Sequence, residues 1–94
     1  MTLEAKYLQA IIDLGDCCFN ESRLGDALEW YRRGLTIDPL REDIYRRVMS
    51  SLAQADRRAE ALRAYENCAR VLKRELGVGP GRGMRMLREE IGGL

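Results

Sequence analysis

Apolar side chains recur at three- and four-residue steps along most of this 94-residue chain, which is the spacing of one face of an α-helix. The steps predict four helices, over about residues 3–20, 22–37, 39–55 and 56–76. No stretch alternates apolar and polar residues as a half-buried strand would. The positions expected to face inward are, in chain order, Leu3, Tyr7, Ile11, Leu14 and Cys18; Leu24, Ala27, Leu28, Tyr31 and Leu35; Leu40, Ile44, Tyr45, Val48, Met49 and Leu52; and Tyr65, Cys68, Val71 and Leu72.

Residues that favour helix ends stand between these segments. Pro39 suits a first helical position, because its missing N–H would have no partner there. Gly77 is the expected left-handed stop of the fourth helix. The side chains expected to cap the four helices are Thr2, Ser22, Asp38 and Asp56.

Residues 77–83 form the only glycine-rich stretch of the chain. Their spacing matches neither GxGxxG nor GxxxxGK[ST], and no strand precedes them, so a phosphate-binding loop is disfavoured. We interpret them as the end of one helix, a turn and the start of another. A short fifth helix over residues 82–91 is then predicted to cover the end of the fold, with Met84, Leu87 and Ile91 facing inward.

Residues 22–35 and 56–69 repeat one pattern at an offset of 34 residues, with Ala-Leu-x-x-Tyr in both copies. This is the tetratricopeptide period, in which a helical hairpin buries its apolar face by stacking on the next copy. We therefore predict an all-α, tetratricopeptide-like right-handed helical solenoid in a single domain over residues 1–94. It would contain two helical hairpins and a C-terminal capping helix.

Small and large residues at set places in each copy are expected to shape the hairpins. Gly15, Ala27 and Ala61 would let neighbouring helices approach closely, while Tyr31 and Tyr65 would fill the space between units. The second copy departs from the first at two places. Met49 stands where the first copy has Gly15, and Lys73 stands where it has Pro39, which suggests that the array ends there.

The charge of the chain is balanced overall, with a formal net charge of +1. Residues 1–40 carry four basic and seven acidic side chains, and residues 41–94 carry twelve and eight. The chain is thus a poor electrostatic match for nucleic acid. It has no apolar run near the ~20 residues that span a bilayer and no signal-peptide pattern at its start, so we expect a cytoplasmic protein.

The sequence offers little catalytic chemistry. It has no histidine and only three cysteines, Cys17, Cys18 and Cys68, of which the last two fall where the repeat needs small or medium apolar side chains. We expect no metal site, no cofactor and no enzymatic activity, because neither an activated nucleophile nor a phosphate loop can be assembled from these residues.

Two segments go beyond the generic repeat. One reads IDPLREDIYRRVM over residues 37–49; the other reads EALRAY over 60–65 and continues to LKRELGVGP over 72–80. Together they resemble the bacterial transcriptional activator domain, the tetratricopeptide-like module of Streptomyces antibiotic regulatory protein-type regulators. The resemblance covers residues 24–91. It implies a regulatory, non-catalytic protein-interaction or oligomerisation module that acts beside a DNA-binding domain, which this chain lacks.

Alternatives to this function remain open at the level of sequence. The chain could be a generic peptide-binding tetratricopeptide adaptor unrelated to transcription. A homodimer is also expected, since a short solenoid with an apolar end face often pairs with a second copy. The third possible function is an auxiliary contact with DNA, in which phosphates would bind weakly to Arg41, Arg46, Arg47, Arg57 and Arg58. The candidate partner-binding residues are Ile12, Asp16, Phe19, Trp30, Arg46, Arg47 and Gln54.

Overall fold

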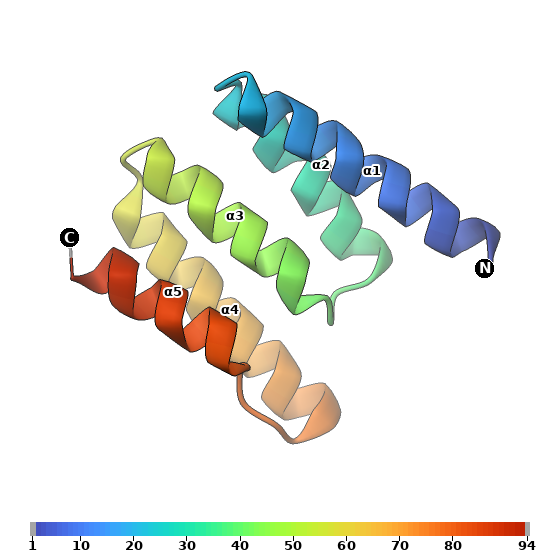
Figure 1. The fold of residues 1–94 in the computed structure, drawn as a ribbon. Helices are drawn as coiled ribbons and strands as arrows, with labels where there is room; N and C mark the ends of the chain where they lie inside the picture. Colours follow the sequence, from blue (N-terminus) through green and yellow to red (C-terminus); the bar gives the residue numbers. More distant parts are fainter. Residues whose placement is uncertain (1, 94) are drawn as a thin grey trace.

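The computed structural model describes residues 2–93 and contains five helices within them. Helices α1 and α2 form one antiparallel hairpin, α3 and α4 form a second beside it, and α5 packs on α4 and α3 (Figure 1). In Figure 1 α1, α3 and α5 run side by side, and α2 and α4 lie behind them. The predicted all-α, tetratricopeptide-like fold with a capping helix is confirmed. The helices are α1 (Leu3–Asn20), α2 (Leu24–Ile37), α3 (Glu42–Gln54), α4 (Arg58–Leu76) and α5 (Arg82–Gly92).

Several predicted helix ends are confirmed. The Thr2 hydroxyl accepts a hydrogen bond from the Ala5 N–H (3.1 Å) and so caps α1. At the end of α4, Gly77 adopts a left-handed conformation with φ of 68°. Leu76 is the last residue of that helix, so the glycine ends it where the sequence predicted.

The predicted caps of α2 and α4 are wrong. Ser22 and Asp56 have φ of 61° and 60° and lie one residue before the observed N-cap residues, Arg23 and Arg57. The backbone N–H of the following residue donates a hydrogen bond to the preceding helix. Arg23 donates to the Cys18 carbonyl, and Arg57 donates to the Leu52 carbonyl (both 2.8 Å). Ser22 and Asp56 therefore end α1 and α3 as left-handed Schellman residues.

The start of α3 also differs from the prediction. The helix begins at Glu42, so Pro39 is not its first residue. The Asp38 carboxylate instead accepts a hydrogen bond from the Leu40 N–H (3.2 Å). This Asx-type turn around Pro39 links the two hairpins.

The small residues of the repeat pack as predicted. Ala27 and Ala61 are fully buried, and Gly15 faces the Tyr31 ring. A Cβ on Gly15 would lie 2.7 Å from Tyr31 Cδ1, closer than real side chains approach. The glycine thus makes room for the ring, whose exposed fraction is only 1 %.

Tyr65 does not repeat the burial of Tyr31, although it occupies the same place in the second copy. It is half-buried and packs against the edge of the core, with the Arg88 guanidinium 5.5 Å from its ring centre. Met49, which replaces Gly15 in this copy, is itself fully buried. A large buried side chain thus stands in the second copy where the first copy has a glycine.

The inward face predicted for α1 is partly wrong. Ile11 and Cys18 are buried, but Leu3, Tyr7 and Leu14 are exposed. The helix packs mainly on α2 (Figure 1), so only the side that faces α2 and α3 is covered. The residues of α1 that are buried are Leu8, Ile11, Ile12, Gly15 and Cys18.

Helix α5 covers the second hairpin as expected, with Met84 and Ile91 buried and Leu87 half-buried. The Glu42 carboxylate at the start of α3 accepts a hydrogen bond from the Gly81 N–H (2.7 Å) at the start of α5. This contact ties the two helix starts together. No helix within residues 2–93 has the length and apolar character needed to cross a membrane.

Candidate interaction groove

The concave side of the fold carries a hollow between α1, α3 and α5. It has a volume of about 430 Å³ and continues into a second hollow of about 350 Å³. Phe19, Ser50 and Leu87 line both, so we describe the two together as the interaction groove. The other residues that line it are Asp16, Tyr31, Asp43, Arg46, Arg47, Ala53, Gln54, Glu90 and Ile91.

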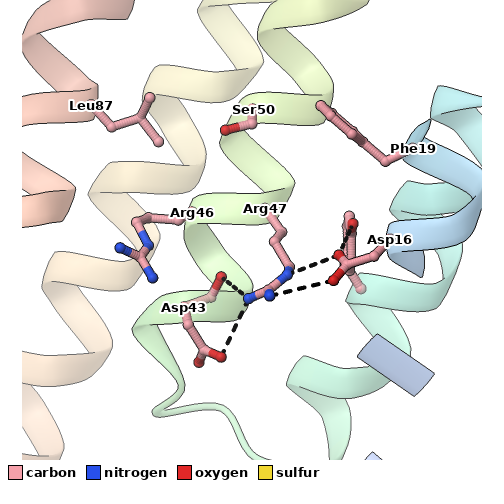
Figure 2. A pocket seen from close by; sticks show the side chains of 8 residues that line it. Asp16, Phe19, Asp43, Arg46, Arg47, Ser50 and Leu87 are labelled. Carbon is pink, nitrogen blue, oxygen red and sulfur yellow. Dashed lines mark hydrogen bonds and ion pairs between the residues drawn. The ribbon is translucent and has the colours of Figure 1, made fainter. Parts of the chain in front are cut away.

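A polar network forms one end of the groove (Figure 2). The Asp16 carboxylate accepts hydrogen bonds from the Tyr31 hydroxyl (2.5 Å) and from Arg47 Nε (2.9 Å). Arg47 also donates through Nη1 to the Asp43 carbonyl (3.2 Å) and to its carboxylate (3.4 Å). Since these residues come from α1, α2 and α3, the network joins the first hairpin to the second.

The surroundings of Tyr31 and Asp43 in the network shift their pKa values in opposite directions. Burial, and then the hydrogen bond to Asp16, raise the pKa of Tyr31, so its hydroxyl stays a donor. The Asp43 carboxylate also accepts two hydrogen bonds from Arg41 (2.8 and 2.7 Å), and these lower its pKa from the ordinary value of 3.8. Asp43 is therefore ionised throughout the neutral range.

The lowered pKa of Asp43 predicts a pH dependence of stability. Because the folded-state pKa lies below 3.8, the stabilisation is complete above that value and is lost as the pH falls through the lowered pKa. An Asp43→Asn chain should be less stable than wild type at pH 6 and should lose less stability between pH 5 and pH 2. Urea unfolding across this range measures both effects. Glu29→Gln, at an exposed site on α2, is the control, and equal acid sensitivity in wild type and Asp43→Asn would contradict the prediction.

Other groove residues keep their side chains free for contact. Phe19 and Leu87 approach Ser50 from opposite sides in Figure 2. Within residues 2–93, Arg46 and Glu90 have no ion pair or side-chain hydrogen bond, although Arg46 reaches toward the first turn of α5. The groove thus combines an apolar middle with a free cation and a free carboxylate.

The structure places the predicted partner-binding residues unevenly. Asp16, Phe19, Arg46, Arg47 and Gln54 all line the groove.

Two of the predicted residues lie elsewhere. Ile12 is 1 % exposed and belongs to the core, so it is not available to a partner. Trp30 on α2 packs at the edge of the core, with the Arg33 guanidinium 4.8 Å from its ring centre. Leu87, which sequence reasoning assigned only to the cap, was missed as a groove residue.

The other arginines considered for phosphate contacts form ion pairs or hydrogen bonds within the fold. Arg41 pairs with Asp43 and Arg57 pairs with Glu60. Arg58 donates a hydrogen bond to the Gly92 carbonyl (2.8 Å).

Cys18 and Cys68 are buried, as predicted, and burial raises the pKa of the Cys68 thiol to about 11. Residues 2–93 contain no cluster of three side chains that could hold a metal ion.

Two hairpins of one repeat and a groove on their concave side define a tetratricopeptide-like helical repeat protein. The family model described as the bacterial transcriptional activator domain matches residues 1–92, and the chain belongs to that family. The resemblance that the sequence motifs indicated is confirmed, over a longer stretch than residues 24–91. No curated protein and no solved structure matches the chain. Membership places the chain among domains of transcriptional regulators.

Proposed function

We propose that the chain is a non-catalytic protein-interaction and oligomerisation module of a bacterial transcriptional regulator, and that it acts beside a DNA-binding domain. A partner protein would bind in the interaction groove. The observation that carries this proposal is the presence of a groove with free apolar and charged side chains in a member of this family.

The middle of the groove suits an apolar side chain of the partner. Phe19 and Leu87 flank Ser50 and are both only partly buried, so a partner residue between them would remove apolar surface from water. Buried apolar or aromatic anchors of this kind carry most of the energy of protein interfaces. An amphipathic helix with one such anchor would satisfy the groove.

The two ends of the groove add selectivity. Arg46 would favour an acidic group of the partner, and Glu90 would favour a basic one. A clamp for a C-terminal carboxylate, as a generic peptide adaptor would need, is disfavoured because such a clamp needs several free basic or amide side chains, and Arg47 of the groove is already paired with Asp16 and Asp43. Since both aspartates are already paired, the groove needs no rearrangement to receive a partner.

A reporter experiment tests the proposal. The chain is fused to an unrelated bacterial DNA-binding domain, and transcription from a promoter with the matching operator is measured in bacterial cells. We expect several-fold higher transcription than with the DNA-binding domain alone, and loss of that gain in Phe19→Asp and Leu87→Asp variants.

The matched control is Val78→Asp, which changes an exposed apolar residue outside the groove and should keep the gain. Circular dichroism confirms that each variant stays helical. If the groove variants activate as well as wild type, the groove is not the partner site. If no fusion activates at all, the proposed role in transcription is wrong.

A further inference from the structure

A row of apolar side chains faces outward along α1. Leu3, Tyr7 and Leu14 are 85 %, 60 % and 46 % exposed. Ala10 and Cys17 are also exposed and continue the row. The five residues follow one another at steps of four, three, four and three residues, and we call them the outer seam.

This spacing is that of helices that pair along their length. Alternating steps of four and three residues keep a row of side chains facing a second helix, as in a coiled coil. No other helix within residues 2–93 covers the outer seam, since α1 packs mainly on α2 and its far side is open (Figure 1). A solenoid normally ends on a polar face, whereas this end also exposes a row of apolar side chains.

We infer that the outer seam binds the outer seam of a second copy of this chain, with the two α1 helices antiparallel. In this arrangement Leu3 of one copy lies opposite Leu14 of the other, and the large Tyr7 lies opposite the small Ala10. A two-fold axis repeats each contact, as symmetry requires of two identical surfaces. The inference extends the oligomerisation part of the proposed function to a surface separate from the groove.

The charges beside the seam select this register. Lys6 and Asp13 flank it on the same side, seven residues apart, and the antiparallel register places Lys6 of each copy beside Asp13 of the other. Lys6 has no ion pair within residues 2–93, and Asp13 accepts only a hydrogen bond from Gln9 (2.9 Å). Shifting the pairing by seven residues in either direction would place Asp13 beside Asp13 or Lys6 beside Lys6. Like charges in contact oppose both shifts.

The size of the seam sets the expected affinity. The 18 residues of α1 span about 27 Å at ~1.5 Å per residue. One pair of helices of this length buries less than the ~1,200–2,000 Å² of a standard protein interface. We therefore expect a reversible dimer with a dissociation constant in the micromolar range, of the order of 10⁻⁵ M.

Analytical ultracentrifugation of the chain, from about 1 μM to about 1 mM, tests the inference. Wild type should shift from monomer to dimer across this range, and Leu14→Glu should raise the dissociation constant about a hundredfold, because an apolar contact is lost at two symmetric places. Lys6→Asp and Asp13→Lys should each raise it about tenfold, because both symmetric ion pairs become repulsive. Val78→Asp, at an exposed residue outside both the groove and α1, is the control and should leave the dimer unchanged.

The mixture of the two charge variants is the sharpest test. When Lys6→Asp and Asp13→Lys are combined in equal amounts, both ion pairs are restored across the interface, one with reversed sign and one as in wild type. A heterodimer of nearly wild-type affinity is then expected, while neither variant dimerises well alone. A parallel pairing, or one shifted by seven residues, would instead leave each single variant about as weak as wild type and make the mixture tighter than wild type.

Three results would overturn the inference. A wild-type chain that stays monomeric at 1 mM would show that something other than a second copy covers the seam. A dimer insensitive to Leu14→Glu would use another surface, and a mixture no tighter than its components would exclude the antiparallel register. The reporter experiment tests the groove residues, and the ultracentrifugation experiment tests the outer seam on α1. A negative result in one experiment therefore does not affect the interpretation of the other.

Discussion

A Tyr31→Ala chain is expected to lose about 3–5 kcal/mol of its free energy of unfolding, the usual cost of truncating a buried aromatic side chain. The Tyr31 ring is 1 % exposed and fills the space beside Gly15. The truncation also removes the hydroxyl that donates to Asp16. Small domains have only about 5–15 kcal/mol in total, so the variant should unfold at much lower urea concentrations or be partly unfolded without it.

Two variants separate the contributions in this experiment. Tyr31→Phe keeps the ring and should cost about 1.5–3 kcal/mol, for the lost hydrogen bond to a charged acceptor. Tyr65→Ala truncates the equivalent residue of the second copy and should cost clearly less than Tyr31→Ala, since Tyr65 is half-buried. Equal losses at the two tyrosines would show that the two hairpins pack alike, contrary to the structure.

A Gly15→Ala chain should be destabilised by about 1–3 kcal/mol, although alanine normally favours a helix over glycine by about 1 kcal/mol. The added Cβ would overlap the Tyr31 ring. The ring has little freedom to move aside, because it is buried and its hydroxyl is hydrogen-bonded to Asp16. Thermal unfolding followed by circular dichroism measures the change.

Gly25→Ala is the matched control for this substitution. Gly25 lies in the first turn of α2, and a Cβ there would have no atom within 4 Å. The same chemical change should therefore leave stability unchanged or raise it by up to about 1 kcal/mol. A Gly15→Ala chain as stable as Gly25→Ala would mean that the ring does not lie against Gly15.

The hairpins were predictable from sequence because their signal is periodic and repeated. The pattern of Ala27, Leu28 and Tyr31 recurs at Ala61, Leu62 and Tyr65, and the tetratricopeptide period links it to one arrangement. The end of α4 was predictable as well, because Gly77 needs no strain to adopt a positive φ.

The inward face of α1 could not be chosen by periodicity alone. The helix carries apolar residues on two sides, one at Leu8, Ile11 and Ile12 and the other at Leu3, Tyr7 and Leu14. Both sets follow helical spacing, so only the position of α2 decides which side is buried. Exposure of the second side is what makes the outer seam visible as a surface.

The helix caps failed for a different reason. A serine or aspartate between two helices suits either the start of one or the end of the other, and the residue type does not distinguish them. In this fold the left-handed turns at Ser22 and Asp56 belong to the ends of α1 and α3. Their occurrence 34 residues apart shows that the repeat extends to the backbone conformation.

The groove was predictable in part. Positions on the first helix of each hairpin face the concave side, which is why Asp16, Phe19, Arg46 and Gln54 were found. Leu87 was missed as a groove residue because the path of residues 77–81 decides where α5 lies, and no periodic signal describes that path.

The central claim is that Tyr31 of α2 packs against Gly15 of α1. The Tyr31 hydroxyl and Arg47 of α3 both donate to Asp16, and these contacts shape one end of the groove. Nuclear Overhauser spectroscopy of the chain in solution tests it most directly, since a Gly15 α-proton points at the Tyr31 ring. We predict strong cross-peaks between the Tyr31 ring protons and the Gly15 α-protons, with further ones to the Arg47 side chain. Tyr31 ring protons with cross-peaks only to residues of α2 would contradict the account.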